Sequence, residues 1–240
     1  MKRTFHRWSP WAVCITGLVA GCVQSDRPMV FVAASLADVA AAWEAGYAGG
    51  FEIHTGASYL LANQIHSGAK ADLFLAAGTD PLSQLLAAGM VQRVDSHFLG
   101  NRLVLVCSPG VKAPDSLQEL LHPRFARIAV ADPELAPAGK YARTGLQKAG
   151  LWDALKPRMI FTGDVRMAAE TVRLATADAA FVYATDVLDA RGIMVLDTLL
   201  FPLAVYPLAM TSESSPELES LWVYLHTAEA RKMASDRGFR

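Results

Sequence analysis

Short apolar runs alternate with stretches of helical periodicity along most of this chain, and this alternation limits the possible folds more than any other feature. Residues 30–34 are apolar, and Leu36, Val39, Ala40 and Trp43 then follow at the spacing of one helix face. The same pattern returns twice in the first half of the chain and several times in the second half. Strands linked through helices pair in parallel with right-handed crossovers, so the sequence predicts an α/β fold.

The expected elements fall into two groups, which predict two closely coupled lobes. The last helix, after Pro216, has no strand of its own, and the simplest packing returns it to the first sheet. We therefore predict residues 22–102 with 208–240 as one lobe and residues 103–207 as the other, with chain crossings near residues 101–105 and 205–208. Each lobe is expected to be a mixed, mostly parallel sheet flanked by helices. The expected strands cover residues 30–34, 51–55, 73–76, 103–107, 128–130, 159–161, 179–183, 193–196 and 205–210.

The first 22 residues have the pattern of an export signal and are not expected to join the fold. Three basic residues precede an apolar stretch over residues 11–20, which is too short to read as a membrane-spanning helix. Residues 19–22 (VAGC) resemble a bacterial lipoprotein cleavage box. This resemblance implies removal of residues 1–21 and a lipid on Cys22, which would anchor the chain in the periplasm or at the outer face of the cytoplasmic membrane. A plain secretory signal cut near Gly21 is the alternative.

Composition excludes several classes of function. Without residues 1–21 the chain keeps 19 basic and 23 acidic residues, a formal net charge of −4. Such a chain has no basic surface for nucleic acid and no bulk field for an anion, so an anion site must be local. Cys107 is then the one cysteine not assigned to the signal or the lipid, so no internal disulfide is expected. No pair of histidines has metal-ligand spacing and no CxxC occurs, so we expect no direct metal-ion ligands and no cofactor.

Four strand-to-helix junctions are suited to an anion. Ligands of open α/β sheets bind at the carboxyl ends of strands, and a helix start carries roughly half a positive charge. Two junctions add a hydroxyl, from Ser35, which is expected at a helix N-cap, and from Ser58. The other two, at residues 137–139 and 163–165, offer backbone N–H groups, and Asp164 is expected to cap its helix. Together they could hold a dianion without a Lys or Arg in the pocket. The simpler interpretation of each serine is an ordinary helix cap.

Seven short stretches, in one order over about residues 29–240, match the motifs of a known family: residues 33–36 (AASL), 57–58 with 61–65 (AS and LANQI), 71–74 (ADLF), 99–103 (LGNRL), 132–134 with 137–142 (DPE and PAGKYA), 164–166 (DVR) and 182–186 (VYATD). Through them the chain resembles the periplasmic molybdate-binding proteins of bacterial ABC transporters, which have a two-lobed type II periplasmic-binding-protein fold. The resemblance implies a monomeric binding protein, not an enzyme, that delivers molybdate or tungstate to an ABC permease. It also implies the oxyanion ligands, which are the hydroxyls and amides of Ser35 and Ser58, the amides of Ala138 and Val165, and the Tyr183 hydroxyl.

Some points stay open at this stage. Tyr59 follows Ser58 where the family commonly has a small hydroxyl residue, and its ring could narrow the pocket or point outward. Residues 76–78 (AAG) stand where a serine and an acid are frequent. Lys140 and Arg166 lie just inside two helices and are expected to be solvated rather than to attract the anion.

Other functions also stay open. The same scaffold could bind sulfate, phosphate or a carboxylate. A serine hydrolase built on Ser35, His54 and Asp72 is a more remote alternative, because nothing in the sequence brings His54 to Ser35.

Overall fold

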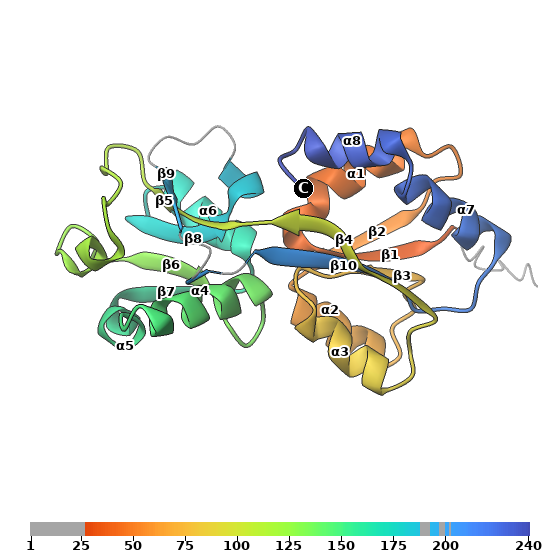
Figure 1. The fold of residues 1–240 in the computed structure, drawn as a ribbon, viewed down its shortest axis with the longest axis horizontal. Helices are drawn as coiled ribbons and strands as arrows, with labels where there is room; N and C mark the ends of the chain where they lie inside the picture. The colour runs from red at the N-terminus through yellow and green to blue at the C-terminus, as the bar shows by residue number, and fades with distance from the viewer. Residues whose placement is uncertain (1–26, 188–192, 197–199, 202) are drawn as a thin grey trace, which may run out of the picture.

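The computed structural model describes residues 27–187, 193–196, 200–201 and 203–240, and it has two lobes that lie side by side (Figure 1). In this part of the chain ten strands form two five-stranded sheets, with the order β2-β1-β3-β10-β4 in the first lobe and β7-β6-β8-β5-β9 in the second. Helices flank both sheets, so the expected two-lobed α/β fold is confirmed. The predicted signal peptide (residues 1–21) and Cys22 lie outside the described residues.

The elements of each lobe follow the predicted strand–helix alternation. The first lobe contains β1 (Met29–Ala33), the 3-10 turn η1 (Ala34–Leu36), α1 (Ala37–Gly46), β2 (Glu52–Gly56), α2 (Ser58–His66), β3 (Leu73–Leu75), α3 (Asp80–Ala87), β4 (Arg93–Asn101), β10 (Ala204–Met210), α7 (Pro216–Leu225) and α8 (Ala228–Ser235). The second lobe contains β5 (Leu103–Cys107), η2 (Leu117–Leu121), β6 (Ile128–Ala131), α4 (Pro137–Lys148), α5 (Trp152–Leu155), η3 (Lys156–Arg158), β7 (Met159–Thr162), α6 (Val165–Arg173), β8 (Ala179–Tyr183), η4 (Ala184–Val187) and β9 (Ile193–Val195).

Both sheets are mixed in the same way. In the first sheet β1 pairs in parallel with β2 and β3, whereas β10 pairs antiparallel with β3 and β4. In the second sheet β6 pairs in parallel with β7 and β8, whereas β5 pairs antiparallel with β8 and β9. One strand of each sheet, β10 or β5, therefore runs against the other four, which confirms the mostly parallel arrangement. Each reversed strand follows a strand of the opposite lobe, β4 before β5 and β9 before β10, rather than a parallel neighbour in its own sheet.

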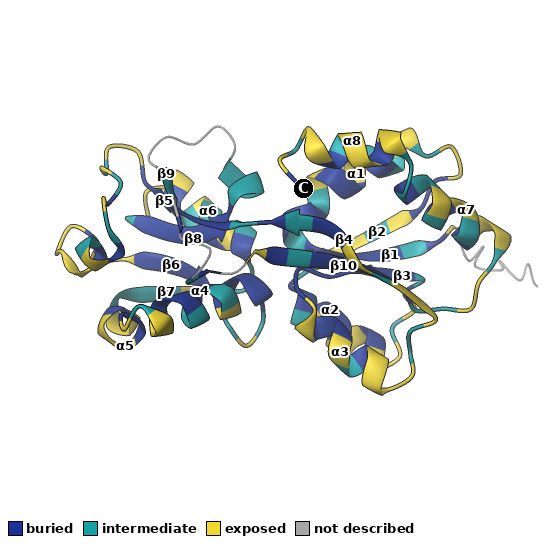
Figure 2. Ribbon diagram, viewed as in Figure 1, coloured by how far each residue is buried: buried dark blue, intermediate teal, exposed yellow. Residues whose placement is uncertain are grey.

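The two faces of the first sheet are covered by different helices (Figure 1). Val30 and Val32 of β1 pack in one apolar cluster with residues of α1, and Phe31 packs in another with residues of α2 and α3. Successive side chains of a strand point to opposite faces, so a strand covered on both sides reads as a continuous apolar run. Figure 2 shows the result, with the central strands β1 and β3 mostly buried, whereas the edge strand β2 and the outer faces of the helices are largely exposed.

Both C-terminal helices pack on the first lobe, α7 through the ion pair of Glu219 with Arg93 of β4 and α8 through a hydrogen bond to α1. The Trp43 indole N–H of α1 donates to the Ala230 carbonyl of α8 at 2.8 Å. The backbones of Gly100 and Arg240 exchange hydrogen bonds at 2.6 and 3.0 Å, which ties the end of the chain to β4. In the described part of the chain, no helix is long and apolar enough to cross a membrane.

Two elements of the first lobe were not expected from the sequence, β4 and α8. The first five residues of β4 are polar or exposed, and its pairing with β10 holds it in the sheet. The chain passes from β4 to β5 at Arg102, and β10 pairs with the first sheet from Ala204 onward. The lobe boundaries at residues 102/103 and 207/208 stay a prediction, and β10 joins the first sheet four residues before the second of them.

Candidate functional site

A small cavity of about 10 Å³ lies between the two lobes, and all five predicted ligand residues line it. The first lobe contributes the carboxyl ends of β1, β2 and β3, and the second contributes the starts of α4 and α6 and the end of β8. The volume is close to the room that one water molecule needs, so the walls must separate before a tetrahedral oxyanion can enter. The five residues are Ser35, Ser58, Ala138, Val165 and Tyr183.

Asp164 is the one charged residue among those described in the cavity lining. Its carboxylate accepts from the Met167 backbone N–H at 2.8 Å, which confirms the expected N-cap of α6. The described lining of the cavity therefore supplies hydrogen-bond donors and helix N-termini and contains no cationic side chain.

Ser58 is the first residue of α2 and is only 2% exposed. Its Oγ accepts from the Ala77 backbone N–H at 3.0 Å. A hydroxyl that accepts in this way keeps its own proton for another acceptor. The Ser58 hydroxyl is thus a donor that faces the cavity.

Ser35 is not the N-cap that the sequence predicted. It lies in the middle of η1, and Leu36 holds the N-cap position of α1 without a side-chain cap bond. The chain tightens into a 3-10 turn directly after β1, so the buried Ser35 hydroxyl lies 3.2 Å from the Tyr206 hydroxyl instead of bonding to the helix start. The residue still lines the cavity, but β10 determines its hydrogen bonding.

Ala138 and Val165 lie in the first turns of α4 and α6, where backbone N–H groups have no partner within the helix. Pro137 begins α4, and its fixed φ suits a first helical position. A Cβ added to Gly139 would lie 1.9 Å from the Ala131 carbonyl oxygen, so only glycine lets α4 start this close to the end of β6. These constraints hold the start of α4 against the cavity.

The Tyr183 hydroxyl is the most telling group of the site. The residue ends β8, is 1% exposed, and its hydroxyl has no hydrogen-bond partner among the described residues. Burial raises the pKa of Tyr183 well above its usual range, so the group stays protonated. An unpaired buried hydroxyl costs about 1–3 kcal/mol, a cost that a bound acceptor would remove.

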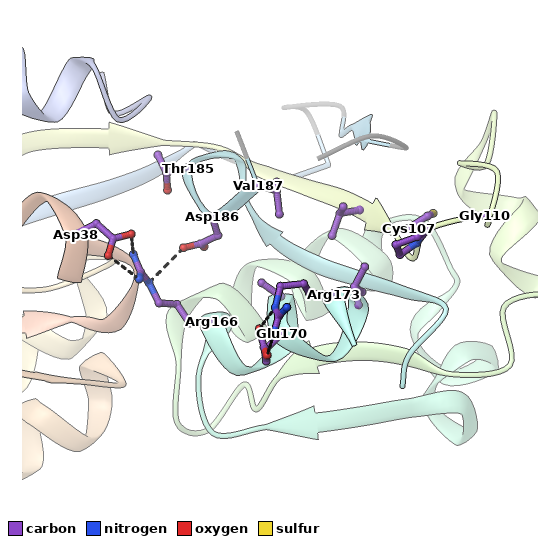
Figure 3. Close-up of a pocket in the computed structure, with 13 residues that line it drawn as sticks. Asp38, Cys107, Gly110, Arg166, Glu170, Arg173, Thr185, Asp186 and Val187 are labelled. Carbon is purple, nitrogen blue, oxygen red and sulfur yellow. Dashed lines mark hydrogen bonds and ion pairs between the residues drawn. The ribbon is translucent and has the colours of Figure 1, made fainter. Parts of the chain in front are cut away.

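Two ion pairs join the lobes outside this cavity, and neither cation is among the residues described in its lining. Lys140 is exposed, as expected, whereas the Arg166 side chain is only 34% exposed and is held in an ion pair. The Arg166 guanidinium of α6 donates to both carboxylate oxygens of Asp38 on α1, at 3.1 and 2.8 Å (Figure 3). Lys140 of α4 pairs with Asp80 of α3. The Tyr59 hydroxyl lies 3.5 Å from the same Asp80 carboxylate, so its ring points to the rim and does not narrow the cavity.

A buried carboxyl group completes the Arg166 cluster. Asp186 follows β8, its side chain is 3% exposed, and its Oδ1 lies 3.6 Å from Arg166 Nε. Burial raises the pKa of Asp186 to about 7, although Arg166 acts in the opposite direction. These residues border a larger cavity of about 950 Å³ (Figure 3). Its cationic side chains, Arg166 and Arg173, are already paired with acidic neighbours, so it does not offer a second anion site.

The hydrolase triad does not assemble. His54 Nε2 lies 3.2 Å from Gln64 Oε1, and the Asp72 carboxylate accepts from the Met29 backbone N–H at 2.7 Å. Asp72 therefore lies at the start of β1, whereas Ser35 follows its end, roughly 20 Å away for a strand of this length. In the part of the chain that the structure describes, no group of three His, Cys, Asp or Glu side chains could hold a metal ion.

Sequence reasoning missed two residues behind the cavity, Asn101 and Tyr206. Asn101 lies within a quoted family motif, and that motif was the available signal. Tyr206 lies in an expected strand, and nothing in the sequence distinguished it from a core aromatic residue.

Two α/β lobes of this topology, with a cavity between them whose described lining contains no cationic side chain, are typical of extracytoplasmic solute-binding proteins. A model of the bacterial extracellular solute-binding protein family matches residues 29–240, so the chain belongs to that family. Among curated relatives, the molybdate-binding protein ModA of Escherichia coli is 31% identical over 196 residues, covering 76% of this chain and 75% of that protein.

A second relative and a solved structure agree with this assignment. YvgL of Bacillus subtilis, named as an ABC transporter substrate-binding lipoprotein, is 33% identical over 191 residues, covering 77% of this chain and 73% of that protein. The periplasmic molybdate-binding protein of Azotobacter vinelandii has a TM-score of 0.80 at 19% identity, with 89% of this chain and 99% of that chain covered. At that identity the likeness supports the shared type II fold.

Proposed function

We propose that this protein captures molybdate or tungstate between its two lobes and delivers the ion to an ABC permease. The observation that carries the proposal is the lining of one cavity by five residues from both lobes, with the Tyr183 hydroxyl buried and without a hydrogen-bond partner among the described residues. Relatives that carry the name of molybdate-binding proteins support this choice of ligand.

The proposed shell consists of hydrogen-bond donors. The hydroxyls of Ser35, Ser58 and Tyr183 and the amides of Ala138 and Val165 would each donate to an oxyanion oxygen. Hydrogen bonds to a charged group contribute about 1.5–3 kcal/mol each. In a site closed away from water the low local dielectric strengthens each of these bonds. Since both lobes contribute donors, the bound ion favours the state in which the lobes are together.

We attribute selectivity to the scarcity of side-chain acceptors in the described lining, where the one carboxylate, Asp164, already accepts from a helix N–H through Oδ1. Hydrogen phosphate would leave its own hydroxyl unpaired at a cost of about 1–3 kcal/mol. Sulfate is fully ionised but smaller, so fewer donors would reach it. This argument ranks sulfate and phosphate below molybdate and tungstate, which are nearly alike in size and charge.

The proposal includes the location and state of the mature protein. We propose cleavage after residue 21, a lipid anchor on Cys22, and a monomer that binds its ligand without a cofactor and without catalysis. Membrane contact would pass through the lipid and the permease alone. The lipoprotein name of the Bacillus subtilis relative supports the anchor.

Isothermal titration of the mature protein with molybdate, tungstate, sulfate and phosphate tests the proposal. We expect molybdate and tungstate to bind most tightly, and Ser58→Ala to weaken molybdate binding by roughly 10- to 100-fold, since one charged hydrogen bond is lost. Ser108→Ala is the matched control, because this buried serine donates to Val172 and Ala177 carbonyls away from the cavity. Unchanged molybdate affinity in both Ser35→Ala and Ser58→Ala would refute the proposed shell. Ester hydrolysis that depends on Ser35 would instead favour the enzyme alternative.

A further inference from the structure

A chain of buried hydrogen bonds runs from the crossing between the lobes to the proposed anion cavity. Asn101 Nδ2 lies 3.3 Å from the Tyr206 hydroxyl, and that hydroxyl lies 3.2 Å from Ser35 Oγ. The three residues are between 0% and 3% exposed, so water does not compete for these bonds. Asn101 ends β4, Tyr206 lies in β10, and Ser35 lines the cavity.

The orientation of the Asn101 amide is determined by its other partners. Its Oδ1 accepts from the Arg102 backbone N–H at 2.8 Å, a bond that the flipped amide could not make. The Nδ2 group therefore faces Tyr206, and it also donates to Thr185 Oγ1 of the second lobe at 2.8 Å. An amide nitrogen can only donate, so the Tyr206 oxygen must accept from Asn101.

The direction of the next bond, which either hydroxyl could donate, follows from what Ser35 would then present to an anion. Tyr206 has a single hydroxyl proton, and burial raises its pKa far above the usual range, so the proton stays on the ring oxygen. If Tyr206 donates this proton to Ser35, the Ser35 proton is free to point into the cavity. In the reverse direction Ser35 would present lone pairs to an oxyanion, which would be repelled.

We infer that Asn101 and Tyr206 form a specificity relay that makes the Ser35 hydroxyl a donor to the ligand and excludes oxyanions that carry a proton. The Ala77 backbone N–H donates to Ser58 Oγ in the same way, so each of the two cavity serines accepts one hydrogen bond from the protein and keeps its own proton for the ligand. A hydrogen phosphate hydroxyl then meets donors in the cavity instead of a serine lone pair. The inference rests on the proposed function, and it adds two positioning residues that do not line the cavity.

Two variants change the relay without touching the cavity lining. In Asn101→Asp a carboxylate faces Tyr206 and accepts a hydrogen bond from its hydroxyl, so Ser35 must donate to the Tyr206 oxygen. Tyr206→Phe keeps the ring but removes the hydroxyl, so Ser35 can accept from a ligand at no cost. Both changes should lower the ratio of molybdate affinity to phosphate affinity at pH 7, by about tenfold or more for Asn101→Asp and by roughly 2- to 10-fold for Tyr206→Phe.

The ratio of molybdate affinity to phosphate affinity distinguishes loss of the relay from a general loss of binding. Misfolding, or the negative charge that Asn101→Asp introduces, would weaken both anions together, so equal losses with an unchanged ratio in the variants would overturn the inference. If Asn101→Asp does not fold, Tyr206→Phe decides by itself. Ser108→Ala should leave the ratio unchanged.

The native protein tests the proposed function separately. Binding of sulfate but not molybdate would refute the proposed ligand, and the sulfate-to-phosphate ratio would then test the relay in the same variants. A native protein that binds phosphate best, or no oxyanion, would overturn the relay.

Discussion

The buried carboxyl group of Asp186 should make the stability of this protein fall as pH rises, and Asp186→Asn should remove that dependence. The side chain is 3% exposed, and its nearest cation, Arg166, is 3.6 Å away and already bonded to Asp38. No hydrogen bond of good geometry reaches either Asp186 oxygen from the described residues. Burial therefore outweighs the attraction of Arg166 and raises the pKa to about 7 from the ordinary value of 3.8.

The magnitude follows from linkage. An acid with a raised pKa binds more protons in the folded state than in the unfolded state, so its contribution is fully present below pH 3.8 and is lost as pH rises through about 7. The difference between the two pKa values corresponds to about 4 kcal/mol as an upper bound. Asparagine is neutral at every pH, so Asp186→Asn should be more stable than the native protein at pH 8 by roughly 1–4 kcal/mol. The gap should close near pH 4.

Urea denaturation of the native protein and Asp186→Asn, each from pH 4 to pH 8 without oxyanion, measures the gap. Asp115→Asn is the matched control, because this carboxylate is 75% exposed. Its stability should follow that of the native protein at every pH. The reasoning fails if Asp186→Asn is less stable than the native protein at pH 8, since Arg166 would then more than compensate for burial of the charge.

Two further predictions concern the contact between the lobes and the start of α4. Arg166→Gln removes an ion pair with Asp38 that is present when the lobes are together, so it should weaken oxyanion binding by up to about fivefold in low salt, and high salt should abolish the difference in titrations. A weakening that persists in high salt would contradict this ionic mechanism. Gly139→Ala should lower the free energy of unfolding by about 3 kcal/mol or more, because its Cβ would lie 1.9 Å from the Ala131 carbonyl oxygen. Gly163→Ala is the control for urea denaturation, because a Cβ there meets a flexible Met side chain at 3.3 Å, and equal losses in both variants would refute the packing argument.

The inter-lobe contacts and the cavity suggest how ligand capture and delivery are linked. The Asp38–Arg166 and Asp80–Lys140 pairs act in the same direction as a bound oxyanion, because each joins the lobes. Exposed ion pairs contribute about 0.2–1 kcal/mol each, which is small beside several charged hydrogen bonds to the ligand. The ligand should therefore dominate closure, while the ion pairs adjust the balance between open and closed states.

The sequence by itself determined the local features of this protein. Apolar runs and helical spacing predicted nine of the strands within a few residues, and the strand β8 was predicted at its observed bounds. The Asp164 cap was also readable, because a cap and the N–H group that it binds are three residues apart. The exposed and polar start of β4 carried no such periodicity, so its pairing with β10 was missed.

Only the tertiary structure decided which distant groups meet. Ser35 was predicted to cap a helix, but its partner is Tyr206, 171 residues away, and the relay through Asn101 exists because β4 and β10 pair beside the crossing. Arg166 was expected in solvent and instead joins the lobes. Local patterns record the energetics of neighbouring residues, whereas the partner of a buried polar group depends on what the whole fold brings within hydrogen-bonding distance.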